Sequence, residues 1–298
     1  MRSLGLPVFG CLLLCCVPSA PAQDMPLSQV LIPGEDWQML GEGYTFTEGP
    51  ACDKDGNVYF TDIPASRIYK IDLDGKVTLF AENTAKTNGL MFGADGKLYG
   101  CRNGEKKIVA YTADGKFETI TEGVTSNDIV VASNGNIWFS DPPNGQVWFV
   151  DAKREKRVVA KDLKPNGVTL TFDEGTLVVT DGENPFLWTF RVKKDGSLDS
   201  QERYYQPLQI PTGRKTPGSD GMAVDKDGRL YVATAAGIQM FDPTGRLGGA
   251  IAKPQPFKAC SNVRFGGPKF EYLYATAGDK VYRRKTRTAG PPYFAKAK

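Results

Sequence analysis

The 298-residue sequence contains no histidine. That absence excludes hydrolysis by a Ser-His-Asp or Cys-His arrangement, and it removes the commonest zinc ligand. The formal net charge is only +3, which argues against a nucleic-acid partner. Beyond the N-terminal residues, no apolar run approaches the roughly 20 residues that span a membrane. The chemistry must therefore use carboxylates, amides, hydroxyls, lysine, arginine or a bound hard cation.

The N-terminal residues have the pattern of a cleaved secretory signal. Arg2 is the only charged residue before Asp24, and an apolar stretch runs from about Leu4 to Val17. Ala20-Pro21-Ala22 then provides the small residues of a signal peptidase site. We therefore expect residues 1–22 to be removed and the mature protein to be secreted or periplasmic. A lipid anchor on a cysteine of this stretch is the weaker alternative.

Three of the six cysteines belong to that signal, and the mature chain keeps Cys52, Cys101 and Cys260. Their odd number and wide spacing fit no metal-ligand motif. In an oxidising compartment they allow one disulfide, and three buried free thiols are the alternative. Residues 23–298 are expected to form a single domain.

An internal repeat runs through this domain. A turn before a β-rich apolar run recurs at Asp55-Gly56, Asp95-Gly96, Asn134-Gly135 and Asp227-Gly228, with degenerate copies at Glu174-Gly175 and Phe270-Glu271. Such dipeptides between apolar runs are the strongest short hairpin signal. Further short apolar runs follow each hairpin. Four short antiparallel strands, repeated six times, predict an all-β fold, a six-bladed β-propeller.

The N-terminal segment is expected to close the ring. After Tyr282 the last repeat has little apolar sequence left for a fourth strand. Trp37-Gln38-Met39-Leu40 lies 8 to 11 residues before Glu48, the offset at which the fourth-strand residues Leu79-Phe80 precede Asn88. We therefore predict that residues 37–43 pair with residues 280–284 as the outer strand of the last blade. This pairing would cover an open sheet edge. The propeller core would then span about residues 37–284.

One polar position recurs about eight residues before each turn. Its six members are Glu48, Asn88, Asn127, Asn166, Asp220 and Asn262. Each begins an innermost strand, so the six should surround one mouth of the central channel. For any single asparagine of the set, the alternative is an ordinary turn residue without a role in binding. Calcium prefers six to eight oxygen ligands. The predicted ligands are Glu48, Asn127, Asn166 and Asp220, with magnesium and manganese as alternative ions.

A second set of residues should return to the same mouth about fourteen positions later. It comprises Asp62, Arg102, Asp141, Asp181 and Thr234. For Asp62, Asp141 and Asp181 the alternative is a purely structural role as loop caps. Arg102 is a lone cation near carboxylates and is a candidate for substrate binding. The long interval before Asp220 adds residues 206–219, either a flap over the mouth or a solvated loop.

Six motifs carry a resemblance to a known family. They are Thr47-Glu48-Gly49-Pro50, Ser126-Asn127-Asp128-Ile129, Phe139-Ser140-Asp141-Pro142-Pro143, Pro165-Asn166-Gly167-Val168, Ser219-Asp220-Gly221-Met222 and Phe265-Gly266-Gly267-Pro268. In order and over nearly the whole mature chain, they resemble the gluconolactonase branch of the senescence marker protein (regucalcin) family. The resemblance implies a six-bladed propeller with one divalent ion, usually calcium, and hydrolysis of sugar lactones.

The resemblance also implies residue roles. Glu48, Asn166 and Asp220 match the metal ligands, Asp220 matches the proposed proton acceptor, and Asn127 matches a residue that touches substrate or metal. The substrate-binding residues differ. Thr125 stands where regucalcin-type members have arginine, and Gly145 where they have glutamate.

These observations predict a calcium-dependent hydrolase of sugar lactones. The ion would polarise the lactone carbonyl, and Asp220 would activate water, with Asp128 as the alternative base. Asn127, Arg102 and Asn88 would bind substrate. The expected partner is a small molecule, with no nucleic acid, membrane span or protein partner implied. A phosphotriesterase with the same metal ligands and a non-catalytic propeller with structural calcium are the alternatives.

Overall fold

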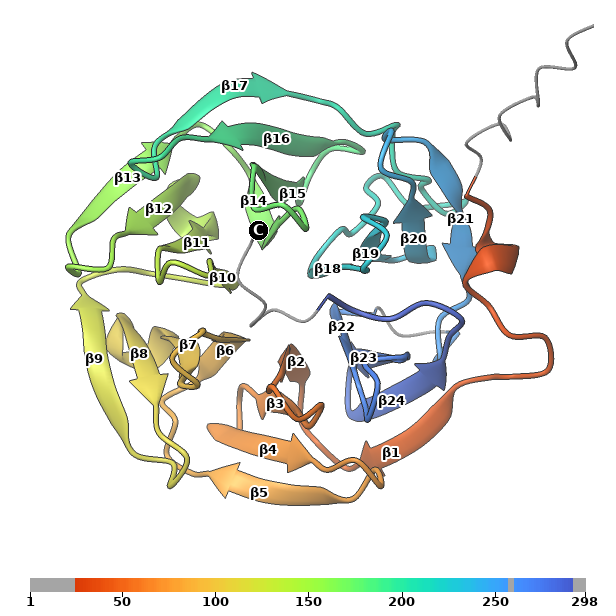
Figure 1. Cartoon of the computed structure of the whole chain (residues 1–298), viewed down its shortest axis with the longest axis horizontal. Coiled ribbons are helices and arrows are strands. Elements are labelled where there is room, and N and C mark those ends of the chain that lie inside the picture. The colour runs from red at the N-terminus through yellow and green to blue at the C-terminus, as the bar shows by residue number, and fades with distance from the viewer. Residues whose placement is uncertain (1–24, 257–259, 292–298) are drawn as a thin grey trace, which may run out of the picture.

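The computed structural model describes residues 25–256 and 260–291. In this part of the chain, six four-stranded antiparallel sheets form a ring of blades around a central axis (Figure 1). The all-β, six-bladed propeller predicted from the repeats is therefore confirmed. The predicted signal at residues 1–22 lies outside the described residues, so cleavage and secretion stay predictions.

Within a blade, the strands lie side by side from the axis outward in the order of the chain. Blade 1 contains β2 (Thr47–Cys52), β3 (Val58–Asp62), β4 (Arg67–Ile71) and β5 (Val77–Ala81). Blade 2 contains β6 (Thr87–Phe92), β7 (Leu98–Arg102), β8 (Lys107–Tyr111) and β9 (Phe117–Glu122). Blade 3 contains β10 (Ile129–Val131), β11 (Ile137–Asp141), β12 (Gln146–Val150) and β13 (Lys156–Ala160).

Blades 4 and 5 follow the same plan, and blade 6 differs in that its outermost strand, β1, comes from the N-terminal segment. Blade 4 contains β14 (Pro165–Leu170), β15 (Thr176–Asp181), β16 (Leu187–Val192) and β17 (Leu198–Glu202). Blade 5 contains β18 (Met222–Val224), β19 (Leu230–Thr234), β20 (Gly237–Phe241) and β21 (Leu247–Ile251). Blade 6 contains β22 (Asn262–Gly266), β23 (Tyr272–Ala277), β24 (Lys280–Lys285) and β1 (Gln38–Glu42). The 3-10 helices are η1 (Leu27–Gln29), η2 (Asn103–Glu105) and η3 (Pro142–Asn144).

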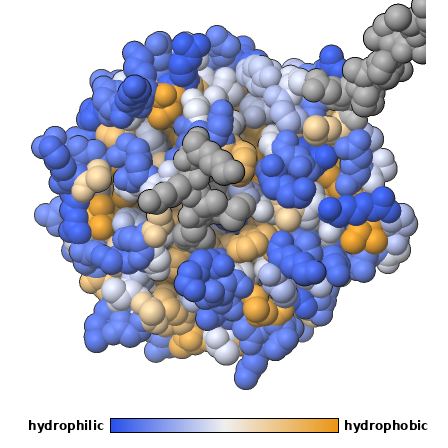
Figure 2. All heavy atoms as spheres, viewed as in Figure 1, coloured by the Kyte–Doolittle hydropathy of each residue, from blue (hydrophilic) through white to orange (hydrophobic). Residues whose placement is uncertain are grey.

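The burial of each strand follows from its place in the blade. Every residue of the innermost strand β2 is buried, because blades pack on both of its faces, whereas most residues of the outermost strand β5 are partly or fully exposed. The cores lie between blades and contain large buried rings such as Trp138, Phe139 and Phe149. The face of the ring seen in Figure 2 is mostly hydrophilic, with apolar residues scattered over it.

The ring closes as predicted. β1 pairs antiparallel with β24, with Gln38 opposite Arg283 and Glu42 opposite Lys280 (Figure 1). Side chains follow the same register, because Lys280 Nζ lies 2.7 Å from Glu42 Oε2 and Arg283 Nε donates to Gln38 Oε1 at 2.9 Å. The N-terminal strand therefore completes the last blade.

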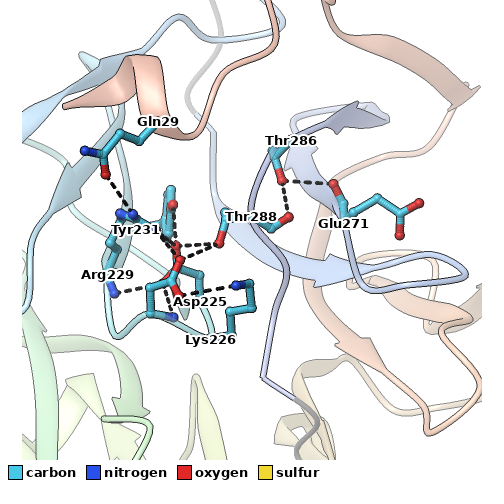
Figure 3. A network of polar contacts seen from close by, with 9 residues as sticks. Gln29, Asp225, Lys226, Arg229, Tyr231, Glu271, Thr286 and Thr288 are labelled. Atoms are coloured by element: carbon cyan, nitrogen blue, oxygen red, sulfur yellow. Dashed lines mark hydrogen bonds and ion pairs between the residues drawn. The ribbon is translucent and has the colours of Figure 1, made fainter. Parts of the chain in front are cut away.

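A polar network ties both ends of the described chain to blade 5 (Figure 3). The Oδ2 atom of buried Asp225 accepts hydrogen bonds from Arg229 at 2.9 Å, Tyr231 at 2.9 Å and Thr288 at 3.0 Å. Arg229 also donates to Gln29 in η1 at 3.1 Å. The segments before β1 and after β24 are thus fastened beyond the β-sheet pairing itself.

Two further expectations concern cysteines and membranes. Cys52, Cys101 and Cys260 are all buried and unbridged, so the free-thiol alternative holds. Burial raises the pKa of each thiol. Among the described residues, no helix has the length and apolar character needed to cross a membrane.

Candidate functional site

The recurring polar residues meet at one end of the central axis. Glu48, Asn88, Asn166 and Asn262 lie on the innermost strands β2, β6, β14 and β22. Asn127 and Asp220 lie two residues before β10 and β18. We call these six residues and Asp128 the axial cluster.

Glycines make this close approach possible. A Cβ atom added to Gly49 would lie 2.3 Å from the Asn88 carbonyl oxygen, and one added to Gly167 would lie 2.2 Å from the Asp220 carbonyl oxygen. Neither position tolerates a side chain without movement of the neighbouring backbone. In blades 1, 2, 4 and 5, the glycine after the polar residue therefore lets the innermost strand contact the next one.

Blade 3 departs from this rule and gains a carboxylate. Asp128 stands at the position that glycine occupies after Glu48, Asn88, Asn166 and Asp220. Its backbone N–H donates to Ser140 Oγ at 3.1 Å. Its Oδ1 atom packs closely on Gly89, because a Cβ atom added to that glycine would lie only 2.6 Å from Oδ1. The axial cluster thus contains a third carboxylate beside Glu48 and Asp220.

The pKa of each of the three carboxylates is raised in the folded protein. Burial, and then the charge of Asp128, raises the pKa of Glu48 to about 8. Burial raises the pKa of Asp128 to about 6. Burial and the charges of Glu48 and Asp128 also raise the pKa of Asp220 well above its ordinary value, although the residue as a whole is partly exposed. Three mutually repelling carboxylates favour a bound cation.

Asn262 connects two of these carboxylates. Its Nδ2 atom donates to Glu48 Oε2 at 3.2 Å and to Asp128 Oδ2 at 3.4 Å. The Val263 N–H donates to Asn262 Oδ1 at 2.9 Å, which turns the amide nitrogen toward the carboxylates. Asn262 is one of the six recurring polar residues, but it was not among the predicted ligands or substrate-binding residues. Its place among those six residues was the signal for a role at the site.

Two amide oxygens supply the test of whether a cation fits. Among the described residues, Asn88 Oδ1 and Asn166 Oδ1 are buried without a hydrogen-bond partner. Leaving such an acceptor unsatisfied costs about 1–3 kcal/mol. No group of three His, Cys, Asp or Glu side chains in the described segments forms a metal site by itself, so amide oxygens would be needed. Carboxylate and amide oxygens are the donors that calcium prefers, and the residues fit that ion.

Arg264 adds a buried positive charge that the sequence analysis did not assign. It lies two residues after Asn262 on β22 and therefore points to the same side of the strand. Its side chain is buried, and its charge opposes the effect of burial on the pKa of Asp128. A charged residue in an innermost strand was the available signal.

Arg102 lies elsewhere. Its guanidinium donates to Asn83 O and Glu105 Oε1, each at 2.9 Å, and to Tyr111 OH at 3.3 Å. The guanidinium carbon lies 4.3 Å from the centre of the Phe117 ring. These contacts hold it against the outer strands of blade 2, so the geometry does not support the predicted contact with substrate.

The aspartates of the second set cap loops. Asp62 accepts hydrogen bonds from the backbone ahead of β2. Asp141 Oδ1 accepts from the backbone N–H of Asn144 at 3.3 Å, and Asp181 Oδ1 accepts from the backbone N–H of Asn184 at 3.0 Å. The loop-capping alternative is therefore confirmed for these residues.

The loop at residues 206–219 packs on blade 5. Gln209 N donates to Gln239 Oε1 at 2.8 Å, and Gln239 Nε2 donates to Gln209 O at 2.9 Å. At its end, Asn166 Nδ2 donates to Ser219 O at 3.4 Å. The loop thus helps to orient an amide of the axial cluster.

Comparison with known proteins gives a consistent result. A family model described as the SMP-30/Gluconolactonase/LRE-like region matches residues 46–279. The chain is 26% identical over 294 residues to a gluconolactonase of Zymomonas mobilis, covering 85% of this chain and 82% of that protein. It is 28% identical over 244 residues to lactonase drp35 of Staphylococcus haemolyticus, covering 75% and 74%.

Solved structures share the fold. The gluconolactonase XC5397 of Xanthomonas campestris superimposes with a TM-score of 0.77 at 26% identity, covering 87% of this chain and 92% of that one. A calcium-binding protein, regucalcin, of Agrobacterium tumefaciens gives a TM-score of 0.71 at 18% identity, covering 87% and 97%. The second likeness concerns the fold alone.

Proposed function

Because this chain belongs to the SMP-30/gluconolactonase/LRE-like family, we propose that it hydrolyses sugar lactones with the help of a divalent cation, calcium fitting best. Relatives named gluconolactonase and lactonase support the reaction class. The observation that carries the proposal is the axial cluster itself. It combines three carboxylates with raised pKa values and two buried amide oxygens without hydrogen-bond partners among the described residues.

Glu48, Asn166 and Asp220 would hold the cation, with Asn127 at or near its coordination shell. The unpartnered Asn166 oxygen and the raised pKa values of the two carboxylates support this set. When bound, such a cation withdraws electrons from a carbonyl oxygen and stabilises the charge that develops there.

The proton transfers fall to the carboxylates. A water molecule attacks the lactone carbonyl carbon, its proton passes to a carboxylate, the ring C–O bond breaks, and the departing oxygen takes up a proton. Asp220 is the proposed acceptor, because it is the partly exposed residue among the three carboxylates, and proton transfer needs a carboxylate within reach of the attacking water. Asp128 is the alternative, held in place by Asn262.

Asn127 and Asn88 are proposed to orient the substrate. The residues around them differ from the regucalcin type: Thr125 Oγ1 donates to Asp141 and is thereby turned toward a capped loop. Gly145 ends η3 in a left-handed conformation with a φ of 64° and brings no carboxylate. These departures leave the preferred sugar lactone to be found by experiment.

Hydrolysis of D-glucono-δ-lactone and other lactones by mature protein, with and without a chelator, tests the proposal. We expect activity that is lost on chelation and restored by calcium. Hydrolysis of a phosphotriester but of no lactone would favour the phosphotriesterase alternative. Calcium binding without hydrolysis of either would favour a non-catalytic propeller.

A further inference from the structure

A cavity lies between blades 4 and 5, away from the axial cluster. Its volume is about 440 Å³, within the roughly 300–1,000 Å³ of small-molecule sites. Its walls come from the β14–β15 turn, from β16 and β17, and from Gly228 in the β18–β19 turn. These turns lie at the ends of β14 and β18 opposite to Asn166 and Asp220. The proposed catalytic chemistry does not use this cavity.

A groove between blades is not in itself unusual in this fold. A smaller groove of about 290 Å³ lies between blades 1 and 2, against the equivalent turns. Its aromatic lining includes Tyr59, Phe92 and Tyr111, which are 8%, 9% and 2% exposed. In the larger cavity, Phe172 and Tyr204 are 53% and 52% exposed. Exposed aromatic rings, rather than volume, distinguish the cavity between blades 4 and 5.

Phe172 breaks the internal repeat. The corresponding turn position holds a polar or small residue elsewhere: Lys54, Ala94, Ser133 and Lys226. The β14–β15 turn is also one residue longer than these turns. The fold therefore does not need an aromatic residue here, since four other blades form the turn without one.

Tyr204 presents a fixed ring. Its hydroxyl donates to the Pro243 carbonyl oxygen at 2.9 Å. The ring meets Tyr205 edge to face, with centroids 5.3 Å apart and planes at 89°. Tyr205 is buried and packs in turn on Phe241. A half-exposed ring that is already immobilised binds a ligand at little further cost in conformational entropy.

The polar lining carries groups of both signs. Glu202 and Arg191 line the cavity from β17 and β16, and both side chains are exposed. In the described part of the chain, the Glu202 carboxylate makes no hydrogen bond or ion pair. Asp173 is used within its turn, where Oδ1 accepts from Thr171 Oγ1 at 2.7 Å. A carboxylate and a guanidinium together suit hydroxyl groups, which both donate and accept hydrogen bonds.

We propose that the cavity lined by Phe172, Tyr204, Glu202 and Arg191 binds a neutral saccharide. The aromatic rings would contact the apolar face of a pyranose ring, and the side chains of Glu202 and Arg191 would bind its hydroxyls. Because the lining carries both signs, it has no strong preference for an anion or a cation. This site is separate from the axial cluster, and the proposal does not depend on lactone hydrolysis.

Calorimetric titration with the β-linked disaccharide cellobiose tests the proposal, with saturation-transfer NMR to identify the bound ring face. We expect saturable binding that weakens about tenfold in Phe172→Lys, which places in blade 4 the residue found in blades 1 and 5. Glu202→Gln should also weaken binding. The matched control Lys54→Ala, in the groove between blades 1 and 2, should bind normally.

Three results would overturn the proposal. The first is the lack of saturable binding to the intact protein. The second is equal binding by wild type, Phe172→Lys and Glu202→Gln, with melting temperatures confirming that both variants are folded. The third is tighter binding of choline than of cellobiose, which would indicate a cation site. Lactone hydrolysis should stay at the wild-type rate in Phe172→Lys.

Discussion

Asn262 of the last blade donates a hydrogen bond to Glu48 of the first blade, with 3.2 Å between Nδ2 and Oε2. The two residues are 214 positions apart and meet because the ring closes. The same nitrogen lies 3.4 Å from Asp128 Oδ2, so one neutral donor serves two buried carboxylates. Asn262 is therefore a positioning residue of the axial cluster.

Replacing Asn262 by alanine should weaken calcium binding about 10–100-fold at neutral pH, the usual effect of losing a group that orients ligands. Without the amide donor, the pKa values of Glu48 and Asp128 should rise further, so proton competition with calcium should increase. Calorimetry at several pH values measures both effects. Asn134→Ala, in an exposed turn, is the control, and an identical calcium affinity in Asn262→Ala would contradict the assigned role.

Glu48→Gln should reduce calcium affinity at least tenfold, because it removes one of the negative charges while keeping the side chain's size. Calorimetry on chelator-treated protein measures the change. The control is Glu42→Gln, since Glu42 is exposed and pairs with Lys280 in the outer part of blade 6. An unchanged affinity in Glu48→Gln would reject Glu48 as a ligand.

Metal-free protein should lose stability as pH rises. Folding raises the pKa of Glu48 from 4.5 to about 8 and that of Asp128 from 3.8 to about 6. Over this range the folded state holds protons that the unfolded chain has released. Their contribution to the free energy of unfolding is fully present below about pH 4 and is lost by about pH 8. Melting temperatures in a chelator should fall across this range.

Calcium should reverse that trend, because it binds the ionised carboxylates. Glu48→Gln provides the control, since it removes the group with the higher of the two stated pKa values and should flatten the metal-free profile. A melting temperature independent of pH between 5 and 8 in the wild-type protein would argue against the close approach of the carboxylates.

The internal repeat explains how much could be predicted from the sequence. Turn dipeptides and apolar runs depend on local backbone preferences, so the six blades and the β1–β24 closure followed from the sequence. The repeat also gives each residue a place along its strand. It does not give the direction of a long side chain. Arg102 was therefore placed near the site, although its guanidinium lies against Phe117.

Side-chain contacts between distant blades could not be predicted from the sequence for the same reason. Nothing local to Asn262 indicates that its amide meets both Glu48 and Asp128, because this depends on the packing of three blades. Arg264 was overlooked because a charged residue in a strand is ordinarily exposed, and here the innermost strand is buried on all sides. Departures from the repeat, such as Asp128 in the place of glycine, were the most informative positions.

The network around Asp225 should stabilise the closed ring. Asp225→Ala leaves the buried Arg229 guanidinium without a main partner, and breaking a buried ion pair in this way costs about 3–5 kcal/mol. Asp227→Ala, at a partly exposed partner of the same arginine, should cost less than about 1 kcal/mol. Urea unfolding compares the two, and equal losses would show that burial of Asp225 adds nothing.

Proton transfer in the proposed reaction should depend on Asp220. A carboxylate that binds calcium is a weaker base, because the cation lowers its pKa, so pure metal ligation is the competing role. Asp220→Asn keeps an oxygen ligand of similar size and removes the basicity. General-base catalysis typically contributes about 10²–10⁴-fold, and we expect kcat to fall by that factor under saturating calcium.

Metal occupancy decides how this result is read. The Asp220→Asn protein must hold calcium, as measured in the same sample, for a loss of kcat to report on proton transfer. A fall in kcat with the ion bound supports Asp220 as the base. Near wild-type turnover with the ion bound would transfer the role to Asp128, which is buried beside Glu48 and shares the Asn262 amide. In that case Asp128→Asn should show the loss instead, and the pH profile of kcat should change with it.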